Sequence, residues 1–375
     1  MPTREEIYAV LATVRDPEIG KPITELDMVK EVTVDGSSVI VEVLLTVAGC
    51  PLKDQIRREV TAAATSVPGV EKVHVELGVM TDEQRQAMVG RLRAGQPTGG
   101  PAEDKPIGFW SPGSKTRAIL VASGKGGVGK SSITANLAVA LAQRGHKVGV
   151  VDCDVYGYSI PKMLNVTGRP VAFEGMFLPL ENHGVKVVSM GFFVPEDQPV
   201  IWRGPMLHKA LHQFLADAYW GDDIDFILLD MPPGTGDVAI SIAQYLPGAE
   251  MLVVTTPQEA AQTVAVRAGR MTDQVNLKVL GVVENMSTFV CPNCDEAHRI
   301  FGDGGGEKLA QSLNSKVLIE VPIDVRLREG GDEGKPITIT DPDSPASKAI
   351  YALAGSIEGA KPSLKGKKLP FSLVN

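Results

Sequence analysis

The sequence predicts an α/β protein in which a mainly parallel sheet, covered by helices on both faces, follows a small α/β domain. Two observations support this prediction. After residue 115, apolar runs of strand length such as RAILVAS (117–123) and FILLD (226–230) alternate with helical stretches, as in a parallel sheet that is buried on both faces. The segment AGQPTGGPAEDKPIGFWSPGSK (94–115) is rich in Gly, Pro and Ser and lacks apolar periodicity, which is typical of a linker.

These patterns divide the chain into parts. We expect a small α/β domain over residues 1–88, a flexible linker over 89–114, the larger α/β domain over 115–360, and a tail over 361–375. The tail carries Lys361, Lys365, Lys367 and Lys368. Its prolines and short length disfavour an amphipathic membrane helix, so we expect it to be solvated.

The composition excludes several classes of protein. The chain has 375 residues, 43% of them apolar, which suffices for two domains with substantial cores. The net charge of −8 disfavours a nucleic-acid partner for the molecule as a whole. No apolar run reaches the roughly 18 residues of a membrane span, and Arg4, Glu5 and Glu6 interrupt any export signal. We therefore expect a cytoplasmic protein without a nucleic-acid or membrane partner.

The elements of the first domain follow from local patterns. Thr3 and Glu6 form a capping box for a helix through Val14. Residues 31–47 alternate apolar and polar side chains around an Asp35-Gly36 turn, as a hairpin does. A helix over 51–67, a third strand over 69–79 and a last helix over 82–92 complete the domain.

The segment GKGGVGKS, Gly124 to Ser131, has the spacing of a phosphate-binding loop, with a predicted strand before it and a predicted helix after it. Backbone N–H groups of such a loop converge on phosphate oxygens, and the helix N-terminus adds positive potential. Lys130 would reach the β- and γ-phosphates of ATP, and Ser131 would bind Mg²⁺. The predicted nucleotide contacts from this segment are Gly124, Lys125, Gly126, Gly127, Val128, Gly129, Lys130, Ser131 and Ser132. The alternative is a glycine-rich turn without a ligand.

Acidic side chains follow two other predicted strands. Asp230 ends FILLD, as the magnesium-binding aspartate of a Walker B strand does; the alternative is an aspartate that only caps a turn. Asp152 and Asp154 end KVGVVDCD (147–154), where they could orient water and metal. Such a pair is weak evidence alone and good evidence beside a phosphate loop.

The cysteines indicate a metal centre. Cys291-Pro-Asn-Cys294 is the only C-x-x-C pair in the chain, whereas a zinc site or a four-iron cluster needs four ligands. Two chains would supply four. The alternatives are a redox-active dithiol, a structural pair, and a zinc site that adds His298 and a fourth ligand.

The two remaining cysteines lie elsewhere in the sequence. Cys50 lies at a strand–helix junction, where it is either a reactive or ligating thiol or a small buried residue. Cys153 lies between two aspartates on a strand, and strand alternation directs it away from them into the core.

Several motifs resemble one family. KGGVGKS with both lysines resembles the deviant Walker A motif of the P-loop NTPases that include MinD, ParA and the nitrogenase iron protein. DCDVYGYSIP (152–161), LLDMPPGTGD (228–237) and CPNC narrow the resemblance to the Mrp/ApbC family of iron–sulfur cluster carriers. In the N-terminal part, RDPEIG (15–20) and LLTVAGCPLKDQI (44–56) resemble the SufT-like domain found in many members.

The resemblance implies roles for particular residues. Lys125 would reach across a dimer interface to the partner's nucleotide, and Lys125, Lys130 and Asp154 would be the catalytic residues, with Asp154 orienting the attacking water. Asp152 and Asp230 would support Mg²⁺ together with Ser131, and Pro232 to Asp237 would form switch II. Asn285 and the segment Val321 to Asp324 would contact adenine.

The function that follows is an ATP-binding and ATP-hydrolysing carrier. By resemblance, a labile [4Fe–4S] cluster would bridge Cys291 and Cys294 of two subunits and pass to apo iron–sulfur proteins, with an assembly scaffold as a further partner. Two other classes stay open. One is a positioning ATPase like MinD or ParA with a structural zinc site, and the other is a reductase like the nitrogenase iron protein.

Overall fold

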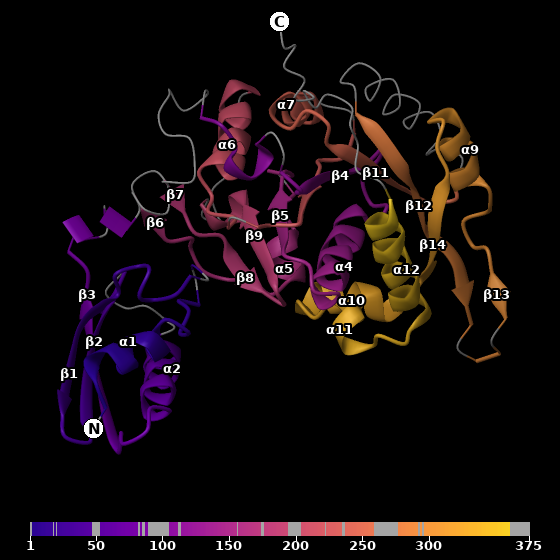
Figure 1. Ribbon diagram of the computed structural model, residues 1–375. Helices are drawn as coiled ribbons and strands as arrows, with labels where there is room; N and C mark the ends of the chain where they lie inside the picture. The colour runs from indigo at the N-terminus through magenta and orange to yellow at the C-terminus, as the bar shows by residue number, and fades with distance from the viewer. Residues whose placement is uncertain are drawn as a thin grey trace, which may run out of the picture. The chain divides into compact units, whose positions relative to one another are not determined.

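The chain separates into two compact units in the computed structural model (Figure 1). The first comprises Met1–Gly99 with Ala172–Leu178, and the second comprises Gly100–Val171 with Pro179–Asn375. The structure describes residues 2–17, 19, 21–46, 53–81, 83–84, 87–88, 105–111, 114–155, 157–173, 176–193, 204–221, 223–234, 237–258, 277–291, 293–294 and 296–360. Cys50, the tail, and most of the predicted linker and of the helix predicted over 82–92 lie outside these residues.

Over its described residues between 2 and 81, the N-terminal unit forms a three-stranded sheet and two helices. Its elements are α1 (Arg4–Leu11), β1 (Val29–Asp35), β2 (Ser38–Leu45), α2 (Lys53–Thr65) and β3 (Lys72–Val79), with strand order β1-β2-β3. The predicted hairpin is confirmed: β1 and β2 are antiparallel, Asp35 pairs with Ser38, and Gly36 has a φ of 62°. Strands β2 and β3 are parallel, since α2 connects them.

Helix α1 begins as predicted and ends earlier. The Thr3 hydroxyl accepts from the backbone N–H of Glu6, and the Glu6 carboxylate accepts from that of Thr3, so the capping box is present. The prediction of a helix through Val14 is wrong, because the helix ends at Leu11. Val14 instead accepts a hydrogen bond from the backbone N–H of Ile23, next to an isolated bridge between Arg15 and Pro22.

The second unit contains a nine-stranded sheet. Seven strands are parallel: β4 (Arg117–Ser123), β5 (Val148–Asp152), β9 (Val185–Ser189), β10 (Phe226–Asp230), β11 (Glu250–Thr255), β12 (Lys278–Val290) and β14 (Val317–Ile323). Strands β8 (Leu180–Asn182) and β13 (Ala297–His298) are antiparallel additions. The order is β13-β12-β11-β4-β10-β5-β9-β8, and β14 also pairs with β12.

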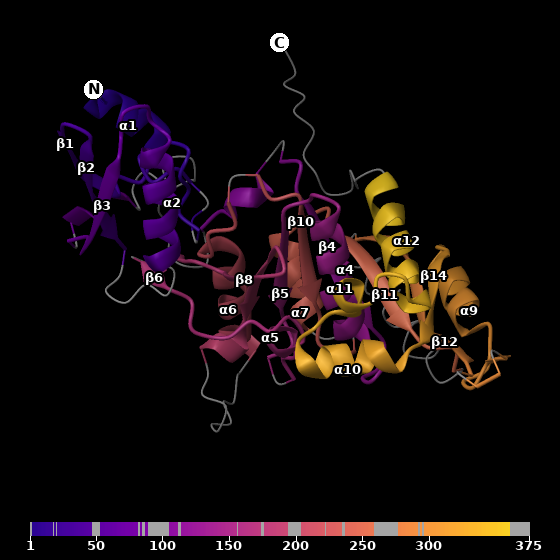
Figure 2. The same ribbon diagram turned by 90° about the horizontal axis from the view of Figure 1, so that it is seen from below.

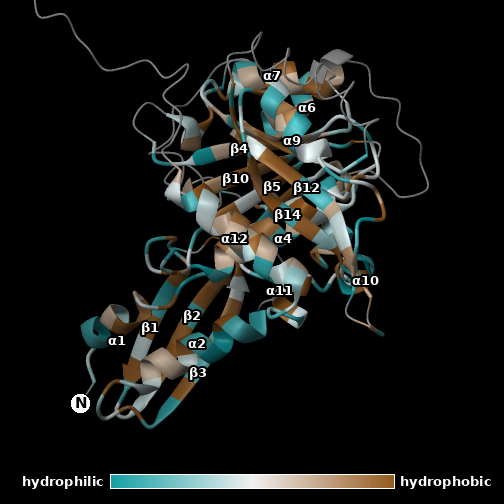
Figure 3. Cartoon of the chain, turned by 90° about the vertical axis from the view of Figure 1, so that its right-hand side faces the viewer, coloured by the Kyte–Doolittle hydropathy of each residue, from teal (hydrophilic) through white to brown (hydrophobic). Residues whose placement is uncertain are grey.

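Helices cover both faces of this sheet, as predicted. Figure 3 shows α6 (Gly204–Ala216) and α7 (Asp237–Tyr245) on one side and α4 (Lys130–Gln143) and α12 (Pro345–Gly359) on the other. Helix α12 lies alongside α4 (Figure 2). The central strands β4, β5, β10 and β11 are buried along their whole length and mostly aliphatic, which explains their continuous apolar sequences.

The remaining described elements are short. They are η1 (Gly108–Trp110), α5 (Ile160–Met163), β6 (Ala172–Phe173), β7 (Met176–Phe177), η2 (Met190–Phe192), α9 (Gly305–Ser312), α10 (Val325–Glu333) and α11 (Ile337–Thr340). Among the helices in the described ranges, none has the length and apolar character needed to cross a membrane.

Candidate functional site

The glycine-rich loop connects β4 to α4 at the carboxyl edge of the sheet. Gly127 and Gly129 have φ angles of 76° and 80°, which glycine adopts without strain. Gly129 is the N-cap of α4, so the first N–H groups of that helix open toward the loop. A cavity of about 230 Å³ lies here, lined by Gly126 to Ser132 and by Ser123, Asp154, Ser159, Met163 and Pro233.

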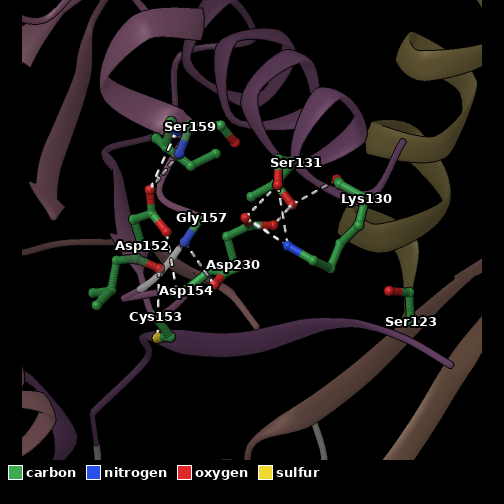
Figure 4. A network of polar contacts seen from close by, with 12 residues as sticks. Ser123, Lys130, Ser131, Asp152, Cys153, Asp154, Gly157, Ser159 and Asp230 are labelled. Carbon is green, nitrogen blue, oxygen red and sulfur yellow. Dashed lines mark hydrogen bonds and ion pairs between the residues drawn. The ribbon is translucent and has the colours of Figure 1, made fainter. Parts of the chain in front are cut away.

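Side chains from the loop and from β10 form one polar network (Figure 4). The ammonium group of Lys130 lies 2.6 Å from Oδ2 of Asp230, and the Ser131 hydroxyl donates to the same oxygen at 2.6 Å. Asp230 is fully buried. The structure therefore brings Lys130, Ser131 and Asp230 together, and their binding of phosphate and Mg²⁺ stays a prediction.

Thr134 was not singled out from the sequence. Its hydroxyl donates to Oδ1 of Asp230 at 2.8 Å, so both carboxylate oxygens have partners. Thr134 follows Ser131 by three residues on α4, and this spacing places two side chains on one helix face. The spacing from Ser131 could therefore have identified Thr134 from the sequence.

Asp152 ends β5 beside Asp230, since the two residues are paired in the parallel register of β5 and β10. Its carboxyl group accepts from the backbone N–H groups of Asp154, Ser159 and Ile160 at 3.1–3.2 Å. Burial, and then the charge of Asp230, raise the pKa of Asp152 to about 7. Asp152 thus holds the loop after β5 in place, and its predicted bond to Mg²⁺ stays a prediction.

Asp154 lies on the loop that Asp152 holds. It is half-buried and lines the cavity opposite the phosphate loop. Its Oδ1 accepts from the backbone N–H of Gly157 at 3.1 Å. The structure thus brings Asp154 to the same cavity as Lys130 and Ser131.

Asn285 supports the phosphate loop from β12. Its Nδ2 donates to the carbonyl oxygen of Val128 at 2.9 Å, and the side chain is buried. A Cβ atom at Gly129 would lie 2.2 Å from this Nδ2, so the contact needs glycine there. The adenine contacts predicted for Asn285 and for Val321 to Asp324 stay predictions, and the Asp324 side chain caps α10.

Lys125 lies at the start of the loop. Its Nζ donates to Oε1 of Gln258 at 2.7 Å, and its carbonyl oxygen accepts from the Ser123 hydroxyl at 3.0 Å. Gln258 was not identified from the sequence, because it lies 133 residues away from Lys125. The lysine therefore has a partner in its own subunit.

The cysteine pair lies at the tip of a hairpin. Strand β12 pairs with β11 as far as Glu284 and continues to Val290, so it extends past the carboxyl edge that carries the phosphate loop. The backbone N–H of Cys291 donates to the carbonyl oxygen of Glu296 at 3.0 Å, which closes the β12–β13 hairpin. Cys291 is half-buried and Cys294 is exposed. Backbone N–H groups of Asn293 and Cys294 lower the pKa of the Cys291 thiol, which favours a thiolate.

The zinc alternative also named His298. His298 is exposed on β13, opposite Phe289 on β12, and its Nε2 lies 3.8 Å from a carboxylate oxygen of Glu296. In the described part of the chain, no group of three or more His, Cys, Asp and Glu side chains is arranged to hold a metal ion. The described residues of one subunit therefore do not assemble that zinc site.

The other cysteines differ in what the structure shows. Cys153 is buried as predicted, and burial raises the pKa of its thiol. Cys50 lies outside the described residues.

A parallel sheet with a phosphate loop, a second loop lysine and a Walker B aspartate defines a P-loop NTPase with a MinD/ParA-like fold and a small N-terminal sheet domain. Residues 114–358 match the NUBPL iron-transfer P-loop NTPase family, and the chain belongs to this family. Residues 4–77 match a second family, the iron–sulfur cluster assembly proteins. The predicted family resemblance is confirmed.

Individual relatives agree with this assignment. The iron–sulfur cluster carrier protein of Mycobacterium tuberculosis is 48% identical over 370 residues, which cover 97% of this chain and 95% of the relative. That of Synechocystis is 41% identical over 365 residues, which cover 96% and 98%. A nucleotide-binding protein from Archaeoglobus fulgidus, solved in complex with ADP, matches with a TM-score of 0.53 and 35% identity. That match covers 61% of this chain and 89% of the solved one.

Proposed function

We propose that this protein is an ATP-hydrolysing carrier that binds an iron–sulfur cluster between two subunits and delivers it to apo-proteins. One observation carries the proposal: Cys291 and Cys294 lie on a hairpin that extends from the sheet edge bearing the phosphate loop. Two half-buried or exposed thiols per subunit are half of the set that a four-iron cluster needs. A second copy of the chain would supply the other half.

The residues of the cavity fit a magnesium nucleotide. The Ser131 hydroxyl and the Asp230 carboxylate are 2.6 Å apart, and oxygen atoms are the ligands that Mg²⁺ prefers. The Lys130 ammonium group already neutralises Asp230. Ser131 and Asp230 would hold Mg²⁺ here, and the ion would supply positive charge that offsets the negative charge developing on the phosphate oxygens.

The protein's own groups then have distinct tasks. Lys130 turns from Asp230 toward the β- and γ-phosphates, and the N–H groups of the loop and of α4 bind phosphate oxygens. Asp154, on the loop that Asp152 holds, orients the attacking water. Lys125 of one subunit stabilises the charge on the transferred phosphoryl group of the partner's nucleotide, as an arginine finger does. Hydrolysis is thereby tied to the dimer that also holds the cargo.

The cysteine ligands suit a cargo that has to leave. Each subunit contributes two of four ligands, so opening the dimer halves the coordination of the cluster. Cys294 is exposed in the single subunit, so opening the dimer would give an acceptor protein access to this ligand. Ligand exchange at an exposed thiolate is the chemistry that transfer to an apo-protein requires.

The test is to measure iron, sulfide, zinc and particle mass on full-length protein reconstituted without oxygen, beside a Cys291→Ser/Cys294→Ser variant. About four irons and four sulfides per dimer, absent from the variant, are expected. One zinc per chain without sulfide would overturn the carrier proposal and favour a positioning ATPase with a structural zinc site.

A further inference from the structure

The contact between Lys125 and Gln258 follows from the sheet. Val254 of β11 pairs with Ser123 of β4, so the residues after both strands leave the same edge side by side. Gln258 follows β11 and Lys125 follows β4, and the Nζ to Oε1 distance is 2.7 Å. The Ser123 hydroxyl, which donates to the Lys125 carbonyl, fixes the backbone of the lysine. The lysine is therefore directed back onto its own subunit.

Close packing fixes the position of Gln258. The preceding residue, Pro257, lies against Gly305 at the start of α9, where a Cβ atom would come within 2.3 Å of the Pro257 carbonyl oxygen. The backbone N–H of Gly306 donates to the Glu284 carboxylate on β12. The start of α9 is thus held between β12 and the segment that carries Gln258.

The same helix is connected to the cysteine hairpin. Strand β13, which closes the hairpin, is followed within a few residues by α9 (Figure 1). The chain thus runs from the cysteine pair through β13 to α9, whose first residues touch Pro257. A displacement of the hairpin that moves the start of α9 would therefore also move Gln258, through the contact between Gly305 and the Pro257 backbone.

We propose that Gln258 is a positioning residue that keeps Lys125 bound within its own subunit. The hydrogen bond between them has to break before the lysine reaches the partner's nucleotide. The proposal rests on the trans role of Lys125 in the proposed function. It adds a barrier to hydrolysis that depends on the packing of α9, and hence on the cysteine hairpin.

Two substitutions at Gln258 separate this role from a structural one, because they act in opposite directions. Gln258→Ala removes the acceptor and frees the lysine. Gln258→Glu replaces a neutral acceptor with a charged one, which binds an ammonium group more strongly. Both variants should bind nucleotide as the wild type does, since Gln258 does not line the cavity.

The experiment measures ATP hydrolysis per subunit against the concentration of full-length protein. We expect Gln258→Ala to lower the protein concentration at half-maximal rate by about threefold, and Gln258→Glu to raise it by about tenfold. In a Lys125→Ala background both effects should vanish, because the group that Gln258 holds is gone. Equal behaviour of the two variants, or effects that persist without Lys125, would overturn the proposal.

The α9 contact gives an independent arm. Gly305→Ala pushes on the Pro257 carbonyl and should shift the concentration dependence in the direction of Gln258→Ala. Gly359→Ala is the matched control, because no atom lies within 4 Å of a Cβ there. An unchanged profile for Gly305→Ala overturns the link to α9.

The outcomes also distinguish this proposal from the one it rests on. If Lys125→Ala hydrolyses ATP normally, the proposed trans role of the lysine is overturned, and the proposed positioning by Gln258 is overturned with it. If Lys125→Ala is inactive while Gln258→Glu matches the wild type, only the proposed positioning by Gln258 is overturned.

Discussion

Lys130 and Asp230 form a buried ion pair at the bottom of the cavity, with 2.6 Å between Nζ and Oδ2 and side-chain exposures of 7% and 1%. The pair joins the first residue of α4 to the last residue of β10. It also keeps the lysine charge compensated while no phosphate is near. Removing one partner of such a pair leaves a charge without compensation.

The ion pair predicts a large effect on stability. Asp230→Ala should lower the free energy of unfolding of the nucleotide-free protein by about 3 kcal/mol, the lower end for a broken buried pair, because Lys130 also borders the cavity. Urea unfolding measures this. Asp343→Ala is the control, since Asp343 is 93% exposed in its pair with Lys348 and should lose less than about 1 kcal/mol. Equal losses in both variants would contradict the prediction.

Substitution of each of the two loop lysines should impair a different step. Lys130→Ala should weaken ATP binding by about 100-fold, the equivalent of about 3 kcal/mol for a hydrogen bond to a charged group. Lys125→Ala should bind ATP normally and lose hydrolysis, since its Nζ contacts Gln258 and not the cavity network. Calorimetry with a non-hydrolysable analogue and phosphate release separate the two steps. Weak binding in both variants would place Lys125 in the nucleotide site of its own subunit.

Asp152 predicts a pH dependence of stability. Its pKa is raised to about 7 in the folded protein, whereas an unfolded chain loses this proton near pH 4. Between these values the folded state binds one more proton than the unfolded state, so this group's contribution to stability falls as pH rises. The free energy of unfolding of the wild type should therefore fall relative to Asp152→Asn from pH 4 to about 7 and then level off. A constant difference in urea unfolding across this window would show that Asp152 is ionised in the folded protein.

Removal of residues 1–100 tests the independence of the second unit. Every described group of the phosphate network, and both hairpin cysteines, lie in the second unit. We therefore expect ATP hydrolysis and reconstituted iron per dimer to stay within about twofold of the full chain. Full-length Cys50→Ser is the control. A folded truncated protein that binds no cluster, together with a Cys50→Ser protein that binds none, would identify Cys50 as a ligand source.

Much of the site could be predicted because its spacing is local. The loop from Gly124 to Ser131 lies between one strand and one helix, and Asp230 ends a run of apolar residues, so both patterns are visible in short windows. The end of α1 at Leu11 was missed, because the turn that replaces the last residues depends on pairing with Ile23.

Contacts between distant segments were harder to predict. Gln258 contacts Lys125 only because β11 lies next to β4, and short sequence patterns do not predict the order of strands in a sheet. The position of Asn285 under Val128 likewise depends on β12 reaching the loop. Thr134 is the exception, since its spacing from Ser131 on α4 was visible.

Strand β12 also fixes the distance between the phosphate loop and the cysteine pair. This strand carries Asn285, which touches the phosphate loop, and leads directly to Cys291. Its register against β14 shifts between Asn285 and Phe289, where Met286 has a φ of 59°. At roughly 3.3 Å per residue, these two residues are at most about 20 Å apart along the strand. Inserting or deleting one residue between them would change this spacing and reverse which face each later side chain occupies. Over evolution, substitutions in this segment should therefore be tolerated more readily than insertions or deletions.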